Sequence, residues 1–476
     1  MLVVGSMIGS GIFLALPIMA REVPSPAVLI GLWVFGGLFT VLGAECCAEL
    51  AAMLPQAGGQ YVFIREAFGN LAAFLVGWTQ FLIIQTGTDA AVAIACAKYL
   101  GSFVPWSSEE NVLTTIPLAS RLPAAAYHCL PKAVHQLDQV GINSAQVVAC
   151  AIIVLLTAVN IRGLREGVWV QNTFTVLKVA ALAALTLAGL WHGIGSPQFI
   201  PASGLSPGQM TLGAGLLGAL AVALSKALFA YDAWYNVTFT AEEVHDSPRT
   251  LPRSLLLGTV VVIVVYVLAN LAYLVVLPVD EIAHVPDDRV AVAVGIKLFG
   301  NIGVTLVTLA VLVSTFGCLN GLILSGARLC YAMARDGLFL RGCGRLHPHR
   351  GTPATALVYQ GVVAIALTFT GSYSGLLTYT MFASVLFLGL MVAALYRLRV
   401  KRPDLSRPYR CWGYPVTPAL YLVVCGAFLV YVIYGEPVGS GIGVLLILTG
   451  IPFYLLWRAR GGAKCANGPT NDRTVE

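Results

Sequence analysis

The chain has 476 residues, of which 58% are hydrophobic and only 11% are charged, and its mean hydropathy is +0.83. An ordinary soluble domain has about 25% charged residues, so this chain has too few charges to cover a water-facing surface of its size. Its formal charge of +6 is too small to indicate a nucleic-acid-binding protein, and the composition predicts an all-α protein that crosses a lipid bilayer several times.

Apolar runs of roughly 20 residues, the length needed to cross a bilayer, occur twelve times. They cover residues 2–20, 27–53, 71–101, 143–161, 168–194, 211–240, 255–277, 301–333, 354–371, 374–396, 414–435 and 439–457. We predict one transmembrane domain over residues 1–460, with helices 1–5 in about 2–194, helices 6–10 in about 211–396, and helices 11 and 12 in about 414–457. Residues 461–476 are expected to form a polar cytoplasmic tail.

The basic residues indicate how these helices are oriented. With the start of helix 1 placed inside, the inner loops and the tail carry twenty lysines and arginines, whereas the outer loops carry six. Such an excess is typical of cytoplasmic loops. We therefore expect a protein of the plasma (inner) membrane with both termini in the cytoplasm. Residues 1–20 lack the basic stretch of a signal peptide and are interpreted as part of helix 1, so the chain either lacks a preceding tail or is truncated.

The first span contains three glycines and two serines between Gly5 and Gly11. This composition weakens a helix, and unwound backbone at membrane depth is tolerated only where it lines a cavity. The N–H groups at the start of a second half-helix would then face an anion, such as the carboxylate of an amino acid. The alternative interpretation is a helix-packing face, because Gly5 and Gly9 have the GxxxG spacing.

The sixth span places Asp232 beside aromatic residues in mid-membrane, where an acid is costly unless it is paired or functional. A break here would free carbonyl groups near Phe229 and Ala230 to accept an ammonium group, and Asp232 could cap the lower half-helix. The alternative is an interfacial aromatic belt, but the apolar run begins at about Leu212, which places Tyr231 near the bilayer centre. Paired breaks in helices 1 and 6 are typical of transporters built from two inverted five-helix repeats.

Sequence motifs spread from helix 1 to the loop before helix 11 support the same interpretation. They are GSMIGSGIF (5–13), AELAAMLPQAGGQY (48–61), REAFG (65–69), FAYDAW (229–234), AEEV (241–244), PR (252–253), YAMARDGLF (331–339) and RPYR (407–410). In these segments the chain resembles the amino acid–polyamine–organocation superfamily, and within it the L-type amino acid transporter branch. The resemblance implies twelve helices in a five-plus-five inverted repeat.

The resemblance also implies a substrate site between the two breaks. Its residues would be Met7, Ile8, Gly9, Ser10, Gly11, Phe229, Ala230, Tyr231 and Asp232. N–H groups around Gly9, Ser10 and Gly11 would hold the substrate carboxylate. Carbonyl groups of Met7 and of the helix 6 segment from Phe229 to Asp232 would hold the α-ammonium group, and Phe229 resembles the outer gating aromatic of the family.

Lys178 lies about ten residues into the fifth span and matches a lysine of the family. In the family it occupies the region where sodium sits in sodium-coupled relatives, which implies sodium-independent exchange or proton coupling. A lysine at this depth is in any case costly unless it reaches polar groups or loses its proton. The alternative is a lysine that extends to the membrane surface.

Three charged residues depart from the usual pattern of the branch: Asp89 on helix 3, Lys226 one turn before Phe229, and Glu45 one turn before Glu49 on helix 2. Because unpaired charges inside a membrane are rare, we expect Asp89 and Lys226 to form a structural pair. The alternative is that either residue contacts a charged substrate side chain and sets specificity.

The sequence gives no indication of a metal site, a cofactor or an enzyme. Its eleven cysteines show no metal-ligand spacing, and no Ser/His/Asp or phosphate-loop motif occurs. His347 and His349 are interpreted as solvated loop residues. Cys129 lies in the outer loop where eukaryotic family members carry a cysteine bonded to a single-span glycoprotein. The residues around it do not match that segment, so no such partner is expected.

The predicted function is alternating-access transport of small neutral amino acids by sodium-independent exchange, as in an antiporter. One alternative is a proton-coupled transporter of cationic amino acids or polyamines, motivated by Asp89 and Asp232. An alternative of another class is a transport-inactive sensor that keeps the fold and binds the substrate.

Overall fold

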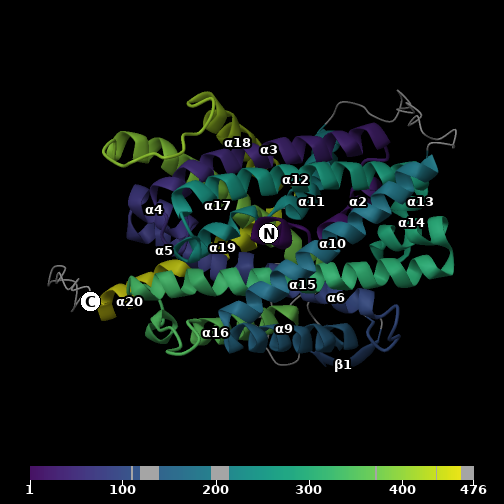
Figure 1. The fold of residues 1–476 in the computed structure, drawn as a ribbon, viewed down its shortest axis with the longest axis horizontal. Helices are drawn as coiled ribbons and strands as arrows, with labels where there is room; N and C mark the ends of the chain where they lie inside the picture. The colour runs from purple at the N-terminus through teal and green to yellow at the C-terminus, as the bar shows by residue number, and fades with distance from the viewer. Residues whose placement is uncertain (109–110, 118–138, 194–213, 370–372, 436, 462–476) are drawn as a thin grey trace.

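The computed structural model describes residues 1–108, 111–117, 139–193, 214–369, 373–435 and 437–461. Long helices such as α3 (Pro26–Met53), α12 (Ser247–Val276) and α15 (Asn301–Arg335) lie along the longest axis of the molecule (Figure 1). The chain is therefore a polytopic all-α membrane protein, as its composition predicts.

Helices 1 and 6 are both broken. Helix 1 consists of α1 (Leu2–Met7) and α2 (Gly11–Glu22), and helix 6 consists of α11 (Ala214–Tyr231) and the 3-10 helix η4 (Trp234–Glu243). Helix 3 is continuous but contains a π-helical turn, η1 (Gln80–Gln85), between α5 (Asn70–Thr79) and α6 (Thr86–Leu100). Turns of this kind are frequently found at functional sites.

The other predicted spans also coincide with helices. These are α9 (Ser144–Arg162), α10 (Leu164–Gly193), α16 (Ala354–Thr368), α17 (Tyr373–Lys401), α18 (Val416–Gly435), and the pair α19 (Pro437–Leu448) and α20 (Gly450–Gly461). Within the described residues, nine helices are long and apolar enough to cross a membrane. The three further predicted spans are the broken helices 1 and 6 and the shorter α16, so the count of twelve remains a prediction.

Three pairs of helices that are five positions apart in the predicted order pack against each other. Helix 1 contacts helix 6 through α2 and α11, helix 2 contacts helix 7 through α3 and α12, and helix 3 contacts helix 8 through α6 and α15. This arrangement is compatible with two five-helix repeats that meet in the centre of the protein. The breaks of helices 1 and 6 are therefore placed close together.

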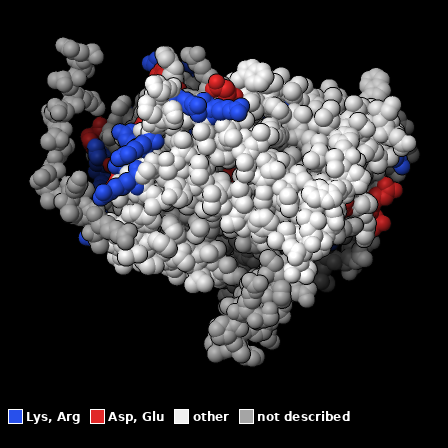
Figure 2. Space-filling model, turned by 90° about the horizontal axis from the view of Figure 1, so that it is seen from below, with Lys and Arg blue, Asp and Glu red and all other residues white. Residues whose placement is uncertain are grey.

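The two ends of the molecule differ in charge. In Figure 2 most of the visible lysines and arginines lie toward the left end and acidic side chains lie at the right end, with a wide uncharged band between them. We call these the basic end and the acidic end. The basic end includes α4 (Gln60–Phe68), the short η6 (Arg341–Gly344) and the segment between α17 and α18. An uncharged band of this kind is what contact with hydrocarbon requires.

The acidic end carries structure that the sequence did not suggest. The loop after helix 7 forms α13 (Val279–Ala283), η5 (Pro286–Asp288) and α14 (Val290–Phe299). The strands β1 (Val112–Pro117) and β2 (Gln139–Asn143) form an antiparallel pair in the loop between helices 3 and 4. Elements this short leave no long periodic pattern, which is why hydrophobic runs do not reveal them.

Candidate functional site

The break in helix 1 is a short, fully buried stretch from Ile8 to Ser10. Ile8 ends α1 with an extended backbone (φ −76°, ψ 91°), and Ser10 precedes the first residue of α2. The glycines here allow close approach of other helices. A Cβ on Gly9 would lie 2.7 Å from Sγ of Cys318, and one on Gly11 would lie 2.7 Å from the Cα of Ala230. The glycines therefore bring helix 1 against helices 6 and 8.

Lys178 is anchored to this break. Its ammonium group donates to the carbonyl oxygens of Gly5 at 2.6 Å, Ile8 at 2.8 Å and Ser314 at 3.3 Å. The side chain is 1% exposed, so it does not extend to the membrane surface. An ammonium group has three donors, and here each meets one acceptor. Lys178 thus connects α10 to α1 and α15 at the point where helix 1 unwinds.

Three further side chains bind carbonyl groups of α1 and the break. Tyr266 of α12 donates to Met7 O at 2.8 Å, Cys318 donates to Ser6 O at 3.1 Å, and Ser314 donates to Ile8 O at 3.2 Å. A carbonyl oxygen has two lone pairs, so the bond from Tyr266 leaves Met7 O able to accept a second donor. Sequence reasoning missed Tyr266, Ser314 and Cys318, since such residues are common in membrane helices.

The break in helix 6 lies at Asp232 and Ala233. The N–H of Asp232 donates to Phe229 O at 3.1 Å, and Ala233 adopts a left-handed backbone (φ 67°, ψ 4°) before η4 begins. A residue with a Cβ pays a conformational cost for this backbone, and such strain is concentrated at functional sites. The sequence predicted a break in this segment, but alanine gives no signal for a left-handed turn.

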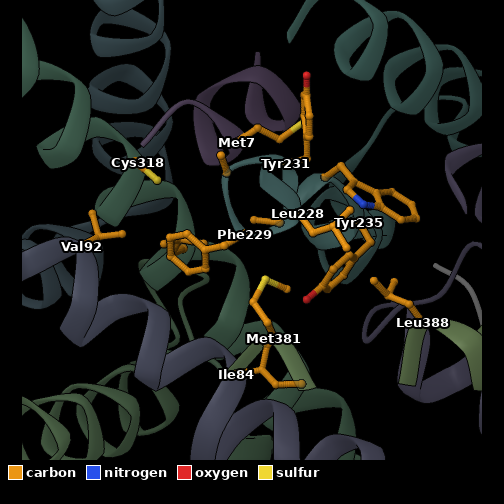
Figure 3. Packing of buried hydrophobic residues seen from close by; sticks show 14 of the residues in the cluster. Met7, Ile84, Val92, Leu228, Phe229, Tyr231, Tyr235, Cys318, Met381 and Leu388 are labelled. Atoms are coloured by element: carbon orange, nitrogen blue, oxygen red, sulfur yellow. The ribbon is translucent and has the colours of Figure 1, made fainter. Parts of the chain in front are cut away.

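Phe229 and Tyr231 point in different directions. In Figure 3 the ring of Phe229 is directed toward Val92 of α6 and Cys318 of α15, whereas Tyr231 points away from them. The hydroxyl of Tyr231 donates to Trp33 O at 3.1 Å, which fixes α11 to α3. Phe229 therefore faces the space beside the helix 1 break, and the side chain of Tyr231 does not.

The sequence is similar to known proteins over most of its length. The sequence model described as "Amino acid permease" matches residues 1–457. The chain belongs to the amino acid permease family. As a permease it is a transporter and not an enzyme.

Similar curated proteins cover almost the whole permease. The large neutral amino acids transporter small subunit 2 of Oryctolagus cuniculus is 30% identical over 98% of this chain and 80% of its own length. The Asc-type amino acid transporter 1 of Mus musculus is 30% identical over 99% of this chain and 82% of its own length. The b(0,+)-type amino acid transporter 1 of Mus musculus is 29% identical over 96% and 86%.

Asp232 of the permease does not cap the lower half-helix. Its carboxylate accepts a hydrogen bond from Ser384 of α17 at 3.2 Å, and η4 has no side-chain cap. The left-handed Ala233 intervenes between Asp232 and the first turn of η4, so the predicted cap is wrong. The Asp232 side chain is buried and borders a narrow cavity that Thr40 and Tyr421 also line.

Asp89 is fully buried, and its hydrogen-bond partner is Gln360 of α16 instead of Lys226. The Gln360 amide donates to one carboxylate oxygen of Asp89 at 2.8 Å. Within the described part of the chain, the second oxygen of Asp89 and the amide oxygen of Gln360 have no partner. Gln85, one turn earlier, donates to Leu322 O at 3.0 Å. Asp89 thus belongs to a polar cluster between α6, α15 and α16, while Lys226 lies buried on α11.

Among the described residues, no group of three or more His, Cys, Asp or Glu side chains is close enough to hold a metal ion. The site consists of backbone groups at two helix breaks, a lysine that fixes one of them, and an aromatic ring beside them. Such a site can bind and release a small polar molecule without chemical change.

Proposed function

We propose that this permease exchanges small neutral amino acids across the membrane without sodium, by alternating access. The observation that carries the proposal is the contact of the Lys178 ammonium with Gly5 O and Ile8 O. Sodium is a hard cation and takes oxygen ligands, as calcium and magnesium do. Because Lys178 already binds carbonyl oxygens that the helix 1 break exposes, no metal cation is needed to bind them.

We propose that the substrate lies between the two breaks. Its carboxylate meets N–H groups around Gly9, Ser10 and Gly11, where the N-terminus of α2 adds a favourable dipole. Its ammonium group meets carbonyl oxygens of Met7 and of the segment from Phe229 to Asp232, where α11 ends and the chain turns. A carbonyl oxygen has two lone pairs, so Phe229 O, which accepts from the Asp232 N–H, has the capacity for a second donor.

The proposed preference for substrates with neutral side chains is supported by the residues near Phe229. Val92 and Cys318, toward which the ring of Phe229 is directed in Figure 3, carry no charge. Of the two acids that motivated a cationic substrate, Asp89 hydrogen-bonds to Gln360 and Asp232 to Ser384. The rabbit relative is named a large neutral amino acids transporter, which agrees with this preference.

We propose that the basic end faces the cytoplasm, with both termini on that side, and that no single-span glycoprotein is required. Positive charge is typical of cytoplasmic loops, and the basic end holds most of it in Figure 2. Cys129, the residue considered for such a partner, lies outside the described residues.

The test is uptake of labelled amino acids into proteoliposomes without sodium, with the vesicles either empty or preloaded with unlabelled alanine. We expect uptake of alanine and other small neutral amino acids that requires internal substrate. Uptake into empty vesicles that is driven by an imposed proton gradient would show that the protein is a proton symporter and not an exchanger. Binding without any uptake would favour the sensor, and preference for lysine or a polyamine would favour the cationic alternative.

A further inference from the structure

A cavity of about 430 Å³ lies at the basic end, separate from the helix breaks. It is bordered by the segment before α4, by the end of η4 and by the end of α15. The polar residues that line it are Gln56, Arg65, Glu242, Tyr331, Arg335 and Asp336. Small-molecule sites have volumes of about 300–1,000 Å³, so this cavity has the size of a ligand site.

The charges that line the cavity are balanced, with two arginines and two acids. On one wall, Arg65 contacts Asp336, which also accepts a hydrogen bond from the Tyr61 hydroxyl at 2.7 Å. On the other wall, Arg335 faces Glu242 at 3.6 Å, and its guanidinium lies 5.6 Å from the ring centre of Tyr331. A balanced set of charges favours a zwitterion over an anion or a cation.

The two walls differ in how readily they can change partners. The Arg335 and Glu242 side chains are 57% and 44% exposed, and ion pairs between exposed groups are weak. Arg65 and Asp336 are less exposed, at 21% and 31%, and have additional partners. A ligand can therefore separate Arg335 from Glu242 at little cost and bind one charge of its own to each.

The position of the cavity connects it to the central site. η4 begins directly after the helix 6 break and ends at Glu243, beside the cavity. Glu243 pairs with Arg328 of α15 at 2.9 Å, and Arg328 is 3% exposed, so this end of η4 is held firmly. Glu242 is thus presented at a fixed place on the basic side of the central site.

We propose that this cavity is a second binding site, which holds the zwitterionic backbone of an amino acid on its way between the central site and the cytoplasm. The carboxylate binds Arg335 and the ammonium group binds Glu242, while the side chain of the ligand remains in the open part of the cavity. This inference rests on the proposed function and on the proposed orientation of the basic end.

The test is equilibrium binding of labelled alanine to the purified full chain in lipid nanodiscs. We expect two alanine molecules per protein, one bound more weakly. Glu242→Gln and Arg335→Gln should each weaken only the second site, by about tenfold, because a charged hydrogen bond is lost. Arg341→Gln, at an exposed arginine of the basic end that does not line the cavity, is the matched control and should leave both sites intact.

The outcomes separate this site from the central one. One alanine per wild-type protein, with exchange intact in proteoliposomes, would overturn the second site but not the proposed function. A changed exchange rate with unchanged second-site binding in both variants would make the Arg335–Glu242 pair a gate and would also overturn it. Equal competition at this site by lactate, which lacks the ammonium group, would exclude a zwitterion site. Each variant is checked for correct folding by size-exclusion chromatography.

Discussion

Lys178 satisfies acceptors that the break in helix 1 exposes. Its three N–H donors bind Gly5 O, Ile8 O and Ser314 O inside the protein, where an unsatisfied polar group costs about 1–3 kcal/mol. The same contacts join helix 5 to α1. Any movement of α1 that opens the site must change them, so the lysine is placed to influence the rate of opening.

Replacing Lys178 with alanine should therefore lower turnover more than substrate binding. We expect exchange of alanine to fall by about tenfold or more, because all three carbonyl groups lose the Lys178 donor and Ile8 O keeps only the Ser314 hydroxyl. Proteoliposome exchange measures turnover, and equilibrium binding measures affinity. Lys297→Ala, at an exposed lysine in α14, serves as the control. An exchange rate in Lys178→Ala that equals wild type at every pH would contradict this role.

Asp89 should tolerate conversion to asparagine. Its partner is the Gln360 amide, and an asparagine amide can still hydrogen-bond to it. We expect Asp89→Asn to keep alanine exchange within about twofold of wild type. Asp89→Leu leaves the Gln360 amide with only a long bond to Leu322 O and should cost about 1–3 kcal/mol of stability. Alanine exchange and melting in detergent check both variants. If the wild-type protein takes up cationic amino acids and Asp89→Asn abolishes that uptake, the result would instead support the cationic alternative.

At the scale of elements, the close approach of α2 and α11 depends on Gly11. An added Cβ would lie 2.7 Å from both the Cα and the Cβ of Ala230, and backbone atoms cannot move aside as a flexible side chain would. We expect Gly11→Ala to separate the half-helices at a cost of about 1–3 kcal/mol and to weaken alanine binding and exchange. Gly31→Ala on α3 is the control, since nothing lies within 4 Å of its added Cβ. Equal activity of the two variants would show that the half-helices need not be this close.

A second prediction at this scale concerns the segment between α17 and α18. Glu49 of α3 is fully buried and accepts bonds from Arg399 at 2.9 and 2.6 Å and from the Cys411 N–H at 2.7 Å. Removing one partner of a buried ion pair costs about 3–5 kcal/mol, so Glu49→Ala should markedly lower the melting temperature in detergent.

The matched control is Glu45→Ala, one turn earlier on α3. Glu45 is partly exposed and accepts from the Tyr409 hydroxyl at 2.6 Å and, more distantly, from the Trp412 N–H at 3.4 Å. Its loss should have a smaller effect than the loss of Glu49. Equal melting temperatures for the two variants would mean that the bonds of Glu49 to Arg399 and Cys411 do not hold α17 and the segment after it in place.

The predicted elements show where sequence patterns are informative. The run 27–53 became α3 (Pro26–Met53) and the run 143–161 became α9 (Ser144–Arg162), because a long apolar run in a membrane has few alternatives to a helix. The breaks were visible because three glycines and two serines are crowded into residues 5–11 of helix 1, and because an aspartate is costly in the middle of helix 6. The failure of the Asp232 cap was not predictable because alanine gives no signal for the left-handed backbone at Ala233, and the partner of Asp89 was not predictable because Gln360 is distant in sequence.

At the scale of the whole molecule, ion pairs close both ends of the bundle. At the acidic end, Arg21 of α2 pairs with Asp288 at 2.8 Å and donates to Ala283 O, which ties helix 1 to the loop after helix 7. At the basic end, Arg65 and Arg328 join α4 and η4 to α15. The alternating access that we propose would require these two sets of contacts to open in turn, never together.

The orientation of the bundle decides which set faces the cytoplasm, and cysteine labelling in intact cells can determine it. Asp280 is 95% exposed at the acidic end, and Ser406 is exposed at the basic end between α17 and α18. Each is replaced by cysteine in a background where Cys129 and Cys465 are serine. The described cysteines are mostly buried and should react little.

An impermeant maleimide should label Asp280→Cys in intact cells and Ser406→Cys only after the membrane is permeabilised. The physical reason is the positive charge of the basic end, since arginine and lysine are retained on the cytoplasmic side of a bilayer. The reverse labelling pattern would show that the molecule has the opposite orientation in the membrane. Arg335 and Glu242 would then face the exterior, and the second binding site would serve uptake instead of release.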